Sequence, residues 1–146
     1  MTQQEFEEKK RQLRTEYAAK SGDINRKKDA VRMQMAQRME FERNTFYNDK
    51  ERHLDDIDCK LRELSLIEKG SQKAISKQME IKVIENKLSR LKTKYYNKLH
   101  THKAAALEQR IALDEDSRQL SAWYAGELAK LAREFKESGE NVECRM

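Results

Sequence analysis

The sequence contains no proline and only four glycines among 146 residues. Because these two residues interrupt helices most strongly, their scarcity favours long, unbroken helices. No apolar run approaches the roughly 20 residues of a membrane-spanning helix, which argues against a membrane protein. The opening residues, MTQQEFEEKK, lack the apolar core of a signal peptide. We therefore expect an intracellular protein, located in the cytoplasm or inside a larger particle.

Residues that carry chemistry are also scarce or badly spaced. The two cysteines do not form the pattern of a disulfide framework. His100 and His102 are two residues apart, whereas metal ligands on a helix are typically four apart. Glycine-rich phosphate loops and nucleophile motifs are absent. The sequence therefore predicts no catalytic residue, no metal, no cofactor and no small-molecule substrate, and hence no enzyme.

What the sequence has in excess is charge. Asp, Glu, Lys and Arg make up 39% of the chain, against about 25% in an average domain. Such a composition is typical of long helices and coiled coils, although disordered chains share it. The net charge of +5 mildly favours an anionic partner.

Periodic apolar residues argue against disorder. In the first half of the chain they recur every eleven residues, at Leu13, Ile24, Met35, Phe46 and Ile57. Further apolar residues lie four positions after members of this series, where a helix places them on the same face: Tyr17, Met39 and Leu61. An eleven-residue repeat corresponds to about 3.67 residues per turn, so the pattern predicts one continuous apolar stripe on a helix.

The centre of the chain predicts a turn. Gly70 is the strongest helix breaker there and suits a helix C-terminus, and Ser71 suits the cap of a following helix. If the chain folds back at this point, residues whose numbers sum to about 141 lie opposite each other. The apolar partners are then Phe6 with Phe135, Leu13 with Leu128, Tyr17 with Tyr124, Met35 with Ala106, Phe46 with Tyr95, and Ile57 with Ile84.

Charges follow the same alignment, because the basic residues 26–28 fall opposite the acidic residues 114–116. We therefore predict an all-α fold, a long antiparallel two-helix hairpin that forms one domain over residues 1–146. Its arms are expected at residues 3–69 and 71–137, each about 100 Å long, with a frayed tail at 138–146. Gly22 and the segment Asp114–Ser117 lie at nearly the same height, so we also expect a joint there.

One stretch of the second arm carries no acidic residue. Between Glu85 and Glu108 the only charged residues are the cations Lys87, Arg90, Lys92, Lys94, Lys98 and Lys103. Three interpretations compete: an ordinary solvated helix face, a docking surface for an acidic protein or another copy of the chain, and a surface for nucleic-acid phosphates. Membrane binding is the least favoured, because the hairpin buries the apolar stripe that it requires.

Two helices alone enclose no deep pocket, so a role based on shape and surface is favoured. We predict a non-catalytic adaptor, stalk or scaffold in a larger assembly, with a protein partner or self-association. In length and predicted shape it is similar to the helical hairpins of export machines and to scaffold proteins of virus particles. A nucleic-acid-associated protein is the alternative, and a helical regulator of an enzyme is a second one.

Overall fold

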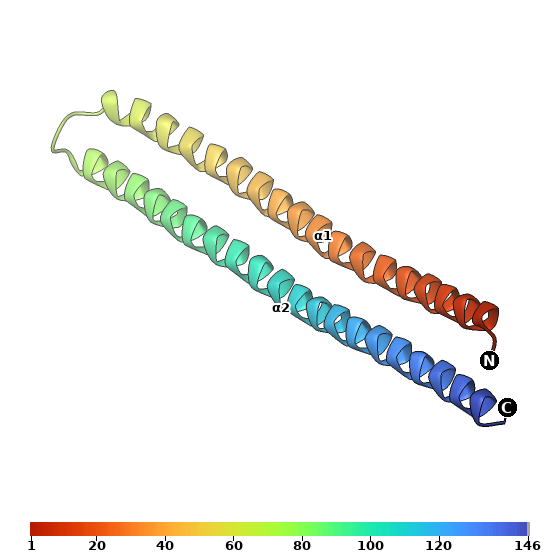
Figure 1. Ribbon diagram of the computed structural model, residues 1–146. Coiled ribbons are helices and arrows are strands. Elements are labelled where there is room, and N and C mark those ends of the chain that lie inside the picture. Colours follow the sequence, from red (N-terminus) through yellow and green to blue (C-terminus); the bar gives the residue numbers. More distant parts are fainter. Residues whose placement is uncertain (146) are drawn as a thin grey trace. The chain divides into compact units, whose positions relative to one another are not determined.

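The fold is a helical hairpin, as the sequence predicts. The computed structural model describes residues 1–145, and the side chains of residues 1–139. Helix α1 spans Gln3–Ser65 and helix α2 spans Gln72–Arg145, and the two pack against each other in antiparallel directions (Figure 1). No strand occurs among the described residues. A short turn, residues 66–71, joins the helices.

Helix α1 begins with a capped first turn. The Oγ1 atom of Thr2 accepts a hydrogen bond from the backbone N–H of Glu5, and the carbonyl of Thr2 accepts one from the N–H of Phe6. These bonds satisfy N–H groups that a helix start would otherwise leave without partners. The capping therefore fixes where α1 starts.

The turn contains Gly70 and Ser71, as the sequence predicts, but α1 ends earlier than expected. The first arm ends at Ser65 rather than at 69, because the N–H groups of Leu66 and Ile67 bond to carbonyls only three residues back. Gly70 does not terminate this helix. It is the third residue of a separate four-residue turn, closed by a bond from the N–H of Ser71 to the carbonyl of Glu68. Its φ of +76° suits that position, which favours glycine in a type II turn.

Helix α2 starts where the sequence predicts. The hydroxyl of Ser71 accepts a hydrogen bond from the N–H of Ala74 at 3.2 Å, which is the geometry of an N-cap. Helix α2 continues to Arg145, beyond the expected end of the arm at residue 137. Proline is absent from this segment, and the N-terminal ammonium group donates a hydrogen bond to Ser138 at 2.6 Å. Met146 lies outside the described residues.

Three aromatic pairs join the helices where the sequence predicts them. Phe6 stacks on Phe135, Tyr17 on Tyr124, and Phe46 on Tyr95, with ring centroids 4.4, 4.5 and 4.4 Å apart. The contact surface between the two helices is called the seam. Four other residues predicted to lie there are half-buried, namely Leu13, Met35, Ile57 and Leu128, and Ile84 is buried. Lys28 forms an ion pair with Asp114 at 2.8 Å, so one of the predicted charge contacts also forms.

The chain divides into two compact units, each containing a section of both helices. We call residues 1–32 with those from 107 onward the terminal unit, and residues 33–106 the tip unit. The expected joint near Gly22 and Asp114–Ser117 does not interrupt either helix, since α1 and α2 both continue through it. Asp114 bonds to Lys28 across the seam rather than capping a new helix.

Seam spacing changes within the tip unit. The members of the eleven-residue series are all half-buried or buried, but Leu61 is 48% exposed and the neighbouring Lys60 turns toward the seam instead. On α2 the inward positions alternate intervals of three and four: Ala74, Lys77, Ile81, Ile84, Leu88, Leu91 and Tyr95. This is a seven-residue repeat, so the tip section of α2 differs from α1, where Met35, Phe46 and Ile57 keep the eleven-residue spacing.

Candidate functional site

The seam of the tip unit determines which side chains α2 presents to solvent. Phe46 is the one buried residue of α1, and it lies flat on Tyr95 with an angle of 8° between the rings. Ala74, Ile81 and Ile84 are the buried residues of α2 in this unit. With this stripe facing α1, the positions between its members face outward.

Charge in the tip unit is divided between the two helices. On α1, residues 33–65 include eight acidic and six basic residues, a net charge of −2. On α2, residues 72–106 include nine basic and two acidic residues, a net charge of +7. One helix is therefore mildly acidic and its neighbour strongly basic.

Side chains of the predicted basic stretch are all exposed. Lys98 pairs with Glu42 at 3.5 Å. Among the residues whose side chains the structure describes, no acidic group lies within 4.0 Å of the other five cations, namely Lys87, Arg90, Lys92, Lys94 and Lys103. The hairpin thus leaves most of this charge available to a partner.

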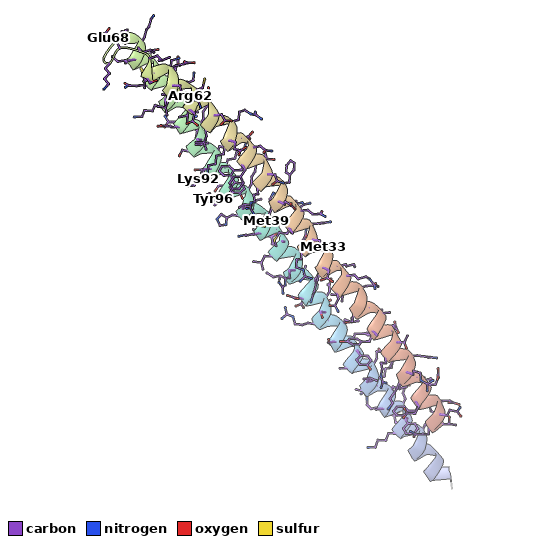
Figure 2. The ribbon with its side chains drawn as sticks, turned by 90° about the horizontal axis from the view of Figure 1, so that it is seen from above. Met33, Met39, Arg62, Glu68, Lys92 and Tyr96 are labelled. Carbon is purple, nitrogen blue, oxygen red and sulfur yellow. The ribbon has the colours of Figure 1, made fainter. Side chains whose placement is uncertain are left out.

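Lys92 and Tyr96 extend from one side of α2, four residues apart (Figure 2). Tyr96 is 50% exposed, although its ring lies tilted against the Tyr95 ring, with centroids 5.5 Å apart. A cation and an aromatic ring at this spacing can contact the same ligand.

Opposite the seam, α2 carries an apolar patch close to the turn. Ile75, Met79 and Val83 follow one another at intervals of four and are 47%, 66% and 52% exposed. Leu66 in the turn is 88% exposed. On α1, Met33 is 61% exposed.

At the edges of the seam, near the turn, four charged residues form a cluster that the sequence analysis missed. Lys60 bonds to Glu80 at 3.2 Å, Lys77 bonds to Glu63 at 2.5 Å, and Lys77 also lies 3.5 Å from Glu80. The hydrogen bond from Lys77 lowers the pKa of Glu63, and that from Lys60 lowers the pKa of Glu80. The hydrogen bond between Lys77 and Glu63 also raises the pKa of Lys77. These contacts align the helices, so the cluster is structural.

Histidines and cysteine form no reactive group in the described part of the chain. The Nδ1 atom of His53 lies 2.6 Å from the carbonyl of Asp49, and the Nε2 atom of His102 lies 3.5 Å from Glu42. Cys59 is free and exposed. No group of three His, Cys, Asp or Glu residues among the described ones has the arrangement of a metal site.

Hollows along the seam are shallow and polar at their edges. One in the tip unit is lined by Met39, Tyr47, Tyr95 and Leu99, together with Glu40 and Arg43. Neither helix has, within its described residues, a stretch apolar and long enough to cross a membrane. The surface features of the tip unit are therefore the strongest candidates for function.

Comparisons with family models, curated proteins and solved structures found no match for this chain. The candidate site must be interpreted from its own chemistry.

Proposed function

We propose that the protein is a non-catalytic interaction protein that acts as an adaptor, stalk or scaffold in a larger assembly inside a cell or particle. The observation that carries this proposal is the outer surface of the tip unit. Ile75, Met79 and Val83 present contiguous apolar side chains to solvent, and further along α2 five cations have no acidic group within 4.0 Å among the described residues. Exposed apolar patches flanked by charge are typical of protein-interaction sites.

The geometry of the hairpin supports this role over catalysis. Acid–base catalysis requires groups held together in a place where burial or neighbouring charges adjust their pKa values. Here the pKa values that depart from their usual range belong to seam ion pairs, and the hollows are open to solvent. The surface is suited to contact with another macromolecule.

A second candidate function is binding of nucleic-acid phosphates. The observation that favours it is the row formed by Lys87, Arg90 and Lys94, at intervals of three and four along α2, which have no acidic group within 4.0 Å among the described side chains. Such binding would weaken steeply with salt, because each phosphate contact releases counterions and contributes roughly 0.9 to the logarithmic slope.

Binding of the purified protein to labelled single- and double-stranded nucleic acid, measured across a salt series, separates the two candidates. The interaction protein is expected to bind neither at physiological salt, and the triple variant K87E/R90E/K94E should change nothing in this assay. Salt-steep binding that the triple variant abolishes, by a protein that remains a single chain in light scattering, would refute the proposed role.

A further inference from the structure

We propose that the partner is a second copy of this chain, docked with the outer face of its α1 against the outer face of α2 in the tip unit. This inference rests on the proposed function and names its partner. It arises from the division of unpaired charge between the two helices.

The outer face of α1 is defined by exposed residues at intervals of three and four: Asn44, Asn48, Glu51, Asp55, Asp58 and Arg62. Its three acidic groups have no basic side chain within 4.0 Å among the described residues. They lie one turn apart, so they form a single acidic row on the side away from α2.

The outer face of α2 is defined in the same way by exposed residues: Ile75, Met79, Lys82, Asn86, Arg90, Thr93, Asn97, His100 and Ala104. This row contains no acidic residue. Lys87 and Lys94 lie along one edge of it. A basic row thus faces away from the hairpin on one side, and an acidic row faces away on the other.

The two rows match at a height that the hairpin itself fixes. Within one chain, paired residues have numbers that sum to about 141, as the Phe46–Tyr95 stack shows. Glu51 and Arg90 therefore lie at one height, and so do Asp58 and Lys82. They cannot meet within a chain, because each lies on the far side of its own helix. A second copy placed beside the first at the same level brings both pairs together.

Helix geometry places Asp58 and Lys82 on the same flank of the proposed interface. In two antiparallel helices that face each other, positions displaced in the same rotational sense lie on the same flank. Asp58 and Lys82 are displaced in the same sense from the centres of their faces. Glu51 and Arg90 are displaced in opposite senses from the centres of their faces, so this second pair depends on the length and flexibility of the arginine side chain.

Apolar contact adds to the charge match near the turn. At the same level, Leu66 of one copy lies beside Ile75 of the other, and these residues are 88% and 47% exposed in the single chain. Arg62 lies opposite Met79, which its aliphatic stem can cover. Exposed ion pairs contribute little individually, so this apolar contact makes the association stronger than charge alone would.

Such an interface is heterologous, because it joins two different faces. Each copy retains one free acidic face and one free basic face after docking. Association then continues along a row unless it is capped, rather than stopping at a dimer. The molar mass of the assembly should therefore increase continuously with protein concentration.

The test uses two variants of the full chain that each reverse one face. E51R/D58K makes both outer faces basic, and K82D/R90E makes both acidic. All four positions are exposed, so each variant should keep the helical circular dichroism spectrum of the unchanged chain. The control E108R/D116K makes the same charge change as the first variant at exposed positions of the terminal unit.

Light scattering at low and physiological salt, over a range of concentrations, gives the result. The unchanged chain and the control should rise above the 17.3 kDa of one chain. Each reversed variant alone should remain at that mass, and an equimolar mixture of the two should recover association. The increase should weaken with salt, since the Debye length shortens from about 30 Å at 0.01 M to about 8 Å at 0.15 M.

Other outcomes overturn the inference in distinguishable ways. If both reversed variants still associate, or if their mixture does not, copies of the chain meet through other surfaces and the proposed role survives. If the unchanged chain stays at the mass of one chain, the self-docking inference is wrong. If that single chain also binds nucleic acid in a salt-steep manner, the proposed function is wrong as well.

Discussion

Replacing Phe46 with alanine should weaken the tip unit more than any change of an exposed aromatic residue. Phe46 is 9% exposed and stacks on Tyr95 with centroids 4.4 Å apart. Burying a phenylalanine side chain contributes about 1.5–3 kcal/mol, and an aromatic pair adds about 0.5–1.5 kcal/mol. Because the seam is open to solvent along its edges, the substitution leaves no enclosed cavity and adds no cavity penalty to this loss. The expected loss in free energy of unfolding is therefore about 2–4.5 kcal/mol.

Urea unfolding followed by far-ultraviolet circular dichroism measures this loss, at a concentration where the chain does not self-associate. The matched control is Phe41→Ala, which removes the same side chain from the same helix at a position that is 67% exposed. That control should change the free energy of unfolding by less than about 0.5 kcal/mol. Equal effects of the two substitutions would refute the argument that the seam, rather than helix propensity, holds the tip unit together.

Three further changes test the turn and the ion pairs. Gly70→Ala should cost about 1–2 kcal/mol in the free energy of unfolding because of its φ of +76°, whereas Gly126→Ala inside α2 should stabilise by about 0.5–1 kcal/mol; similar effects at both positions would contradict the turn geometry. Ser71→Ala should cost about 1 kcal/mol in urea unfolding through loss of the α2 cap, and Ser71→Asp should restore it. The ammonium groups of Lys77 and Lys60 lower the pKa values of Glu63 and Glu80 below 4.5. These ion pairs therefore stabilise the folded chain above about pH 4.5, and their contribution is lost as the pH falls toward the lower pKa values of the folded state. The thermal midpoint should therefore decrease in acid, and a midpoint that stays level down to pH 2 would show that these pairs add nothing.

Much of the fold follows from the sequence because its determinants are local or periodic. Ser71 caps a helix in most contexts, and the apolar spacing defines the face that each helix buries. One central glycine then sets the alignment, from which the Phe6–Phe135 and Phe46–Tyr95 pairs follow directly. The match of several pairs to one alignment is what makes this kind of prediction strong.

The features that the sequence did not predict depend on competition between nearby residues. Gly70 was expected to end α1, but the helix ends at Ser65, since no residue between them forces a particular stopping point. The ion cluster around Lys77 was also missed, although Glu63 lies opposite Lys77 in the predicted alignment. A search for charge pairs with the same sum would have found it. The basic stretch could be located from the sequence, but its lack of acidic neighbours required the side-chain positions of both helices.

The order in which the seam pairs follow along the chain matters for how the protein is made. Lys77 and Glu63 are 14 residues apart, whereas Phe6 and Phe135 are separated by almost the whole length of the chain. Closing a short loop costs less entropy, so pairing should begin beside the turn and proceed toward the termini. At about 5–20 residues per second, a ribosome needs on the order of 10 s to add the residues between Phe6 and its partner. During that interval the first helix exposes its apolar stripe, so the start of α1, which is synthesised before α2, is the last part of the helix pair to be protected.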